Sequence, residues 1–262
     1  MAWSIYSDSE KETPLSLVTL ESKKELALVR LSNGVTNAIS PDLAEELSTV
    51  IAQVKKDCAG MVLAGGEKFF SMGFDLPKLL LLDRSGMTEF FYFFNKVVFE
   101  ILTIPVPTAA AIKAHAIAGG TILLLACDYR VAASGKVLIG LNEIKLGVPA
   151  PYLPDLILRR IAGDVVASEM LYLGEFIDSS DAEKKGIVTS MFPKSDVEDR
   201  ALEIVASVAR LPTKAFQAAK ANRVEAIRSR YENSFRTKNE EFLDCWFSPE
   251  TQELLSEAAK KF

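Results

Sequence analysis

The sequence has few of the residues from which metal centres and disulfide frameworks are built. It contains one histidine, His115, and three cysteines, Cys58, Cys127 and Cys245, in 262 residues. These residues show no metal-ligand spacing, and so few cysteines in a long chain give no disulfide framework. We therefore expect no metal site and a reducing compartment. His115 is interpreted as structural, because no supporting pattern of serine, cysteine and acid surrounds it in the sequence.

Positive charge and long apolar runs are also scarce. The formal net charge is −5 and the pI is about 5.2, which argues against binding of nucleic acid through a basic surface. The longest apolar runs, such as residues 117–127 and 79–82, are shorter than the roughly 20 residues of a bilayer span. Residues 1–8 lack a basic region followed by an apolar core, and the C-terminal Lys260-Lys261-Phe262 is not of the Ser-Lys-Leu type. We expect a cytoplasmic protein without membrane insertion.

What the sequence does contain is an alternation of short apolar segments with helical stretches, and 49% of its residues are hydrophobic. This alternation favours an α/β fold with parallel crossovers. Ser40 is suited to cap a helix that begins at Pro41. Helices are predicted over residues 41–54, 199–210 and 213–230, and strands over residues 16–20, 26–32, 60–64, 107–111, 129–132 and 187–191.

Two adjacent glycines, Gly119 and Gly120, precede the apolar run 122–126. Glycines at the start of a helical run allow a tight turn and leave backbone N–H groups directed outward, at the positive end of the helix dipole. Such groups can stabilise an oxyanion, which also needs a second donor from elsewhere in the chain. The segment 69–76, with Gly73 in it, is the candidate for this second donor.

Three short motifs follow one another along the chain. Residues 37–40 read N-A-I-S, residues 70–76 have the form F-S-x-G-x-D-L, and residues 118–120 hold the glycine pair. In this order and spacing the motifs resemble those of the crotonase superfamily, also called the enoyl-CoA hydratase/isomerase superfamily. The resemblance implies that the backbone N–H groups of Phe74 and Gly119 form an oxyanion hole for a thioester.

The resemblance also implies a fold, a ligand and an assembly. The expected fold is an α/β, crotonase-like ββα spiral core over residues 1–196, which carries the CoA-thioester site. A C-terminal helical region, residues 197–262, is expected to mediate assembly into a homotrimer or hexamer. Backbone groups of Met72 and Leu76 are expected beside the adenine of CoA. Because CoA is part of the acyl-CoA thioester substrate, no separate cofactor is implied.

The side chains around the thioester distinguish one crotonase from another. Enoyl-CoA hydratases of this superfamily use two glutamates, and the matching positions here hold Ile122 and Glu143. A single carboxylate is enough for a double-bond shift, because it can remove a proton from C2 of a 3-enoyl thioester and return it to C4. The segments 127–130 and 139–147 resemble Δ3,Δ2-enoyl-CoA isomerases, whereas dienoyl-CoA isomerases have an aspartate at the position of Pro151. We therefore predict a Δ3,Δ2-enoyl-CoA isomerase of fatty-acid β-oxidation, with Glu143 as the proton shuttle and with a pKa raised by its apolar neighbours.

Apolar residues near these motifs are candidates for the acyl pocket. The aromatic run 90–94 falls mostly on one face of a helix and is interpreted as core. The resemblance places part of this helix beside the acyl chain, so Phe94 and Ile122 are assigned to the acyl pocket.

Two alternatives to the isomerase remain open. Another single-carboxylate crotonase, such as a weak hydratase, a thioester hydrolase or a decarboxylase, would use the same residues with water beside Glu143. A non-catalytic acyl-CoA-binding protein would keep the oxyanion loops, and Ile122 shows that one familiar catalytic position is vacated. Glu143, taken without the motifs around it, would also suit the solvent-facing side of an amphipathic segment.

Overall fold

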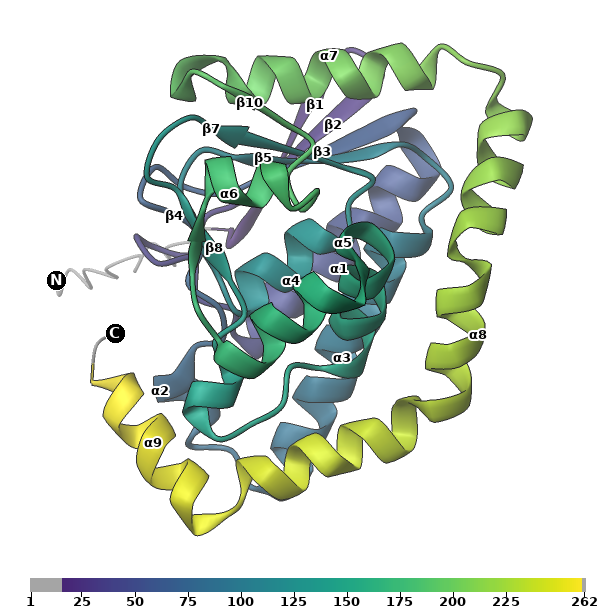
Figure 1. The fold of residues 1–262 in the computed structure, drawn as a ribbon. Helices are drawn as coiled ribbons and strands as arrows, with labels where there is room; N and C mark the ends of the chain where they lie inside the picture. Colours follow the sequence, from purple (N-terminus) through teal and green to yellow (C-terminus); the bar gives the residue numbers. More distant parts are fainter. Residues whose placement is uncertain (1–15, 261–262) are drawn as a thin grey trace, which may run out of the picture.

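A computed structural model describes residues 16–260, which form an α/β fold with two sheets (Figure 1). Residues 1–8 and the C-terminal Lys261 and Phe262, on which the expectations about targeting signals rest, lie outside the described residues. None of the helices between residues 16 and 260 has the length and apolar character that a membrane crossing requires.

The larger sheet contains six strands within the described residues. In spatial order they are β1 (Val18–Lys23), β2 (Leu26–Leu31), β3 (Gly60–Ala64), β5 (Thr108–Ile112), β7 (Tyr129–Ala133) and β10 (Ser190–Phe192). All neighbours are parallel except the hairpin β1–β2. Both β3 and β5 are buried along their full length, which explains why their sequences are almost continuously apolar and do not alternate.

Strands of the smaller sheet come directly after strands of the larger sheet along the chain. Its strands are β4 (Phe69–Ser71), β6 (His115–Ile117), β8 (Leu138–Gly140) and β9 (Ile177–Asp178). Along the chain, β3, β5 and β7 are each followed by a strand of the smaller sheet and then by a helical segment, which confirms the ββα spiral. The strands of the smaller sheet were not predicted, because strands of two or three residues show no alternation of their own.

Helices cover both faces of the larger sheet. One face is covered by α7, which packs against β3, β5 and β7, and α1, α3 and α4 lie on the other side (Figure 1). Ser40 caps the first helix as predicted, because its hydroxyl accepts a hydrogen bond from the Leu43 N–H at 3.3 Å. The helices are α1 (Pro41–Asp57), α2 (Leu76–Leu79), α3 (Arg84–Thr103), α4 (Gly119–Leu125), α5 (Tyr152–Leu173), α6 (Ser179–Lys184), α7 (Val197–Ala209), α8 (Thr213–Trp246) and α9 (Pro249–Ala259), with 3₁₀ turns η1 (Glu143–Leu146) and η2 (Lys194–Asp196).

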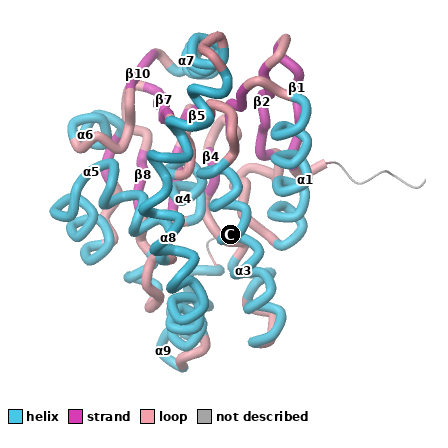
Figure 2. The backbone as a smooth tube through the Cα atoms, turned by 90° about the vertical axis from the view of Figure 1, so that its right-hand side faces the viewer, coloured by secondary structure: helices cyan, strands magenta, loops and turns pink. Residues whose placement is uncertain are grey.

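The last two helices form a hairpin, here called the α8–α9 hairpin. Helix α8 packs against α5 and α3 along the side of the molecule, and α9 returns to contact α2 and η1 (Figures 1 and 2). The helical character predicted for this region is confirmed, although α8 continues to Trp246 and does not end near residue 230.

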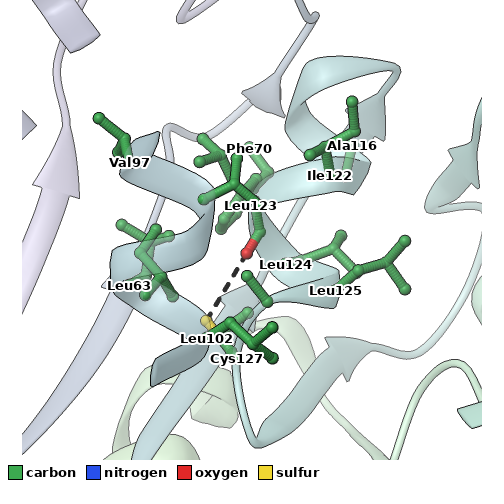
Figure 3. Packing of buried hydrophobic residues seen from close by; sticks show 14 of the residues in the cluster. Leu63, Phe70, Val97, Leu102, Ala116, Ile122, Leu123, Leu124, Leu125 and Cys127 are labelled. Atoms are coloured by element: carbon green, nitrogen blue, oxygen red, sulfur yellow. Dashed lines mark hydrogen bonds between the residues drawn. The ribbon is translucent and has the colours of Figure 1, made fainter. Parts of the chain in front are cut away.

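Helix α4 is enclosed by the core. Its seven residues are all buried, and side chains from β3, β4 and α3 surround it, among them Leu63, Phe70 and Val97 (Figure 3). A helix that is apolar on every side is stable only in such an interior. The packing therefore holds its first residue, Gly119, in a defined position at the edge of the core.

Candidate active site

The smaller sheet and α4 border a cavity of about 450 Å³ with a mainly apolar lining. Because β4, β6 and β8 are parallel, the segments that follow their C-terminal ends meet at one edge of this sheet. These segments and the α8–α9 hairpin contribute most of the lining of the cavity. The predicted site residues that border it are Met72, Phe74, Leu76, Gly119, Ile122 and Glu143.

The backbone of Phe74 is oriented by a short parallel bridge to Ile39. The Ile39 N–H donates to the Gly73 carbonyl at 2.7 Å, and the Asp75 N–H donates to the Ile39 carbonyl at 3.0 Å. In a parallel bridge the residue between these two partners directs its own N–H to the opposite side. The Phe74 N–H thus faces away from Ile39, and Gly73 supplies the positive φ of 92° that the loop needs.

The N-A-I-S segment around Asn37 serves as a support for this loop, a role that the sequence analysis did not assign. The Ser71 hydroxyl donates to the Asn37 carbonyl at 2.7 Å and accepts the Gly73 N–H at 3.2 Å. The Asn37 side-chain amide donates to the carbonyls of Phe69 and Phe70, both at 3.3 Å. These bonds satisfy buried polar groups and hold the first donor loop in one conformation.

The second candidate donor, Gly119, is the first residue of α4, so its N–H has no acceptor within the helix. Ala118 before it has φ 47° and ψ −116°, a strained conformation for a residue other than glycine. A Cβ atom added to Gly73 would lie 3.2 Å from the Gly119 nitrogen, and one added to Gly120 would lie 2.4 Å from the Ser71 carbonyl oxygen. The two glycine-containing segments are therefore in direct contact, and side chains would separate them.

Glu143 begins η1 and is 8% exposed. Its Oε2 atom is buried and has no hydrogen-bond partner among the described residues, and the same is true of Oδ1 of the neighbouring Asn142. Burial raises the pKa of Glu143 from 4.5 to about 7, and a hydrogen bond to its own backbone offsets this in part. The direction agrees with the expectation drawn from its apolar neighbours. A carboxyl group in this state can exchange a proton near neutral pH.

Phe94 lies behind the cavity lining and does not border it. It is 1% exposed, and its ring packs edge-on against Phe74 with 5.0 Å between centroids and an interplanar angle of 85°. Phe94 therefore supports the loop of Phe74 from behind and, contrary to what a place in the acyl pocket would require of it, does not line this cavity. Helical periodicity identified a buried face of α3 but could not show that the Phe74 loop covers it.

Several cavity residues were not identified from the sequence. His115 borders the cavity, and its Nδ1 accepts the Leu138 N–H at 3.0 Å, so it combines a structural bond with a place on the lining. The α8–α9 hairpin, which the sequence analysis assigned to oligomerisation, adds Phe242, Trp246 and Leu255. These residues lie a hundred positions or more from the motifs, and no local signal connects them to the site.

No group of three or more histidine, cysteine, aspartate or glutamate side chains in residues 16–260 is arranged to hold a metal ion. The polar side chains on the lining include the carboxyl group of Glu143, the amide of Asn142 and the imidazole of His115, and most of the other lining side chains are apolar.

Comparison with known proteins identifies the family. The sequence profile described as enoyl-CoA hydratase/isomerase matches residues 21–258. The chain belongs to this family. It is thus an enzyme of the crotonase superfamily, whose members act on acyl-CoA thioesters.

Solved structures confirm the predicted crotonase fold. The crystal structure of human mitochondrial delta3-delta2-enoyl-CoA isomerase matches with a TM-score of 0.89 at 25% identity, covering 94% of this chain and 98% of that one. An enoyl-CoA hydratase from Bacillus halodurans matches with a TM-score of 0.83 at 23% identity, covering 92% of this chain and 100% of that one.

Sequence relatives carry the names of both activities. A probable enoyl-CoA hydratase of Mycobacterium tuberculosis is 31% identical over 223 residues, which cover 80% of this chain and 85% of the relative. Enoyl-CoA delta isomerase 3 of Arabidopsis thaliana is 29% identical over 181 residues, which cover 66% of this chain and 76% of the relative. Since similar chains bear either name, their names do not distinguish an isomerase from a hydratase, and the residues of the site are the remaining evidence.

Proposed function

We propose that this enzyme is a Δ3,Δ2-enoyl-CoA isomerase of fatty-acid β-oxidation, which converts 3-enoyl-CoA into trans-2-enoyl-CoA. The observation that carries the proposal is the number of carboxyl groups that border the cavity. Among residues 16–260, Glu143 is the one acidic residue on the lining, and the position of a hydratase's first glutamate is taken by the buried, apolar Ile122. One carboxylate suits a proton transfer between two carbons of the same substrate.

In the proposed reaction, the thioester oxygen accepts hydrogen bonds from the N–H groups of Phe74 and Gly119. Glu143 removes a proton from C2, the electron pair of that C–H bond forms a C1–C2 double bond, and the C1–O π pair becomes negative charge on the thioester oxygen. The resulting dienolate intermediate keeps its C3–C4 double bond. The same carboxyl group then returns the proton to C4, where the C3–C4 π pair binds it, while the C1–C2 pair becomes the C2–C3 double bond and the charge on the oxygen re-forms the carbonyl. One donor to such an oxyanion contributes about 2.7–4 kcal/mol to the transition state.

The raised pKa of Glu143 fits this role. A base with a pKa of about 7 is partly ionised at neutral pH, and its conjugate acid still releases the proton to C4. Apolar side chains make up most of the lining and disfavour water beside the base, which favours return of the proton to the substrate.

For binding, we propose that CoA lies along the backbone of Met72 and Leu76 and that no cofactor is needed beyond the substrate. Assembly into a homotrimer or hexamer also remains a proposal.

A second candidate, a weak enoyl-CoA hydratase, is favoured by a specific observation. Oδ1 of Asn142 and Oε2 of Glu143 are both buried acceptors on the cavity lining that lack a donor. A water molecule offers two donors and would suit such a pair. The two activities differ in product mass, because hydration adds one water and isomerisation adds nothing.

The test is incubation of the purified enzyme with 3-hexenoyl-CoA and 3-dodecenoyl-CoA, with products separated by chromatography and weighed by mass spectrometry. We expect the 2-enoyl thioester at unchanged mass, and a loss of about 10²–10⁴-fold in its rate of formation in Glu143→Gln, which lacks the base. Glu175→Gln is the matched control, since Glu175 is exposed and paired with Lys145. Full isomerase activity in Glu143→Gln would contradict the mechanism. Gain of water by trans-2-hexenoyl-CoA, supplied in parallel because hydration acts on a C2–C3 double bond, would favour the hydratase.

A further inference from the structure

The α8–α9 hairpin gives the cavity an apolar wall. Phe242 and Trp246 from α8 and Leu255 from α9 border the cavity, and each of the three is 1% exposed. Ala258, the remaining hairpin residue on the lining, is also apolar. Apart from the indole N–H of Trp246, a wall of this composition offers a ligand no hydrogen bond and no charge, so its main contribution is contact with hydrocarbon.

The beginning of the smaller sheet also borders the cavity, through Phe69, His115 and Leu138, the first residues of the parallel strands β4, β6 and β8. Helix α9 contacts α2 and η1, which follow the C-terminal ends of these strands. The groups proposed to hold the thioester also follow those strand ends, so α9 lies near the point from which the acyl chain extends into the cavity.

Stacked aromatic rings hold the indole of Trp246 in place. Phe91 of α3 stacks on Phe242 with 3.9 Å between centroids and an interplanar angle of 9°. Phe242 in turn stacks on Trp246, one helical turn later, at 6.0 Å and 27°. The Gln252 side-chain amide donates to the Trp246 carbonyl at 2.7 Å, which ties the turn between the two helices to the same residue.

Helix α9 is fastened to the turn that carries Glu143. The Thr251 hydroxyl donates to the Gly147 carbonyl at 3.0 Å, and Thr251 is 2% exposed. The contact is close, because a Cβ atom on Gly147 would lie 2.4 Å from the Thr251 Oγ1 atom. Val148, which also borders the cavity, donates its N–H to the Glu143 carbonyl at 3.2 Å. The hairpin and the turn of Glu143 therefore form one packed unit, and the wall stands at a defined distance from the base.

We propose that Trp246 sets the upper limit of acyl-chain length and restricts the enzyme to acyl groups of medium length. Its indole is the largest of the hairpin side chains that border the cavity, and the cavity of about 450 Å³ lies in the lower half of the roughly 300–1,000 Å³ typical of ligand sites. The proposal rests on the proposed function in one respect, namely that the ligand is an acyl-CoA thioester.

Calorimetric titration with saturated hexanoyl-, octanoyl-, dodecanoyl- and hexadecanoyl-CoA tests this proposal without any turnover. In the wild type we expect affinity to rise to octanoyl-CoA and to fall for hexadecanoyl-CoA. In Trp246→Ala the ratio of dodecanoyl-CoA affinity to hexanoyl-CoA affinity is expected to rise about tenfold, because the chain gains room and buries more methylene groups. Trp246→Phe keeps the aromatic stack, and its affinity ratio is expected to rise by less than in Trp246→Ala. If Trp246→Ala does not fold, the ratio in Trp246→Phe tests the proposal.

The matched control is Phe91→Leu. Phe91 is 0% exposed and stacks on the same Phe242 ring, but it does not border the cavity, so its loss disturbs the stack without lengthening the pocket. An unchanged affinity ratio in folded Trp246→Phe or Trp246→Ala would overturn the proposal, and so would an equal shift in Phe91→Leu. A shift confined to the Trp246 variants, in an enzyme that does not turn over 3-enoyl-CoA, would support the chain-length limit and overturn the isomerase.

Discussion

At the scale of single residues, the environment of Glu143 links proposed chemistry to stability. The residue is nearly enclosed, and burial is the main cause of its raised pKa. Burial of an ionisable base lowers the stability of the folded protein, because the ionised carboxylate is poorly solvated in the buried site.

The pH dependence of stability should show this cost. Below pH 4.5 the carboxyl group is protonated in both the folded and the unfolded protein, whereas between 4.5 and about 7 only the unfolded chain releases the proton, so stability falls as pH rises. Glu143→Gln cannot ionise and escapes this loss. We compare the free energy of unfolding of the variant with that of the wild type at each pH. The difference, variant minus wild type, is expected to be larger by about 2 kcal/mol at about pH 8 than at about pH 5. Urea unfolding of both proteins at the two pH values measures this difference, and parallel pH profiles would contradict it.

At the scale of elements, Thr121 joins three parts of the site. It lies in the first turn of α4 and is fully buried. Its hydroxyl lies 2.7 Å from the Ala116 carbonyl of β6 and 3.0 Å from the Gly140 carbonyl of β8, and it accepts the Gly140 N–H at 3.1 Å. One side chain therefore sets how the glycine segment of α4 sits on the smaller sheet.

Thr121→Val keeps the shape and removes this hydroxyl. The Gly140 N–H then loses its buried acceptor, and we expect a loss of about 1–3 kcal/mol in the free energy of unfolding. Equilibrium urea unfolding with unchanged m-value is the appropriate measurement. Thr49→Val on the exposed surface of α1 makes the same chemical change, since the Thr49 hydroxyl bonds only to the Glu45 carbonyl of its own helix. Equal effects in the two variants would show that Thr121 does not join these elements.

At the scale of the whole molecule, an ion-pair cluster connects the C-terminal helical layer to the larger sheet. Glu198 of α7 pairs with Arg30 of β2 at 2.7 Å and with Lys113, beyond β5, at 3.0 Å. The hydrogen bond with Arg30 is the main cause that lowers the pKa of Glu198 from 4.5 to about 2. The cluster joins segments that are far apart in the chain, so it can form only after the sheet and α7 have come together.

Glu198→Gln tests this connection. A lowered pKa means that the stabilisation is complete above pH 4.5 and is lost as the pH falls toward 2. Allowing for the partial exposure of the pair, we expect the variant to be less stable by about 1–2 kcal/mol at neutral pH, with a smaller difference at about pH 3.5. Thermal and urea unfolding at both pH values measure it. Glu203→Gln, an exposed α7 residue paired with Arg200, provides the comparison and should have little effect.

Much of the architecture could be predicted because it depends on local patterns. The predicted strand 60–64 coincides with β3, and the predicted N-cap Ser40 with the start of α1. The smaller sheet escaped prediction because its strands are stabilised by partners 20 to 50 positions away and not by their own composition. Phe94 shows the same limit at a single residue, since its helix face was predictable but the loop that covers it was not.

The α/β class and the helical C-terminal region follow from local patterns in the sequence alone. The two glycine-containing segments are visible there as candidate donors, and the resemblance to the crotonase superfamily pairs them and singles out Glu143 as the proposed base. Only the tertiary structure decided that the donor segments touch, that the carboxyl group of Glu143 is buried without a partner, and that the α8–α9 hairpin walls the cavity. Each of these depends on which distant surfaces pack together, and packing of that kind is determined by the whole fold and not by any one segment.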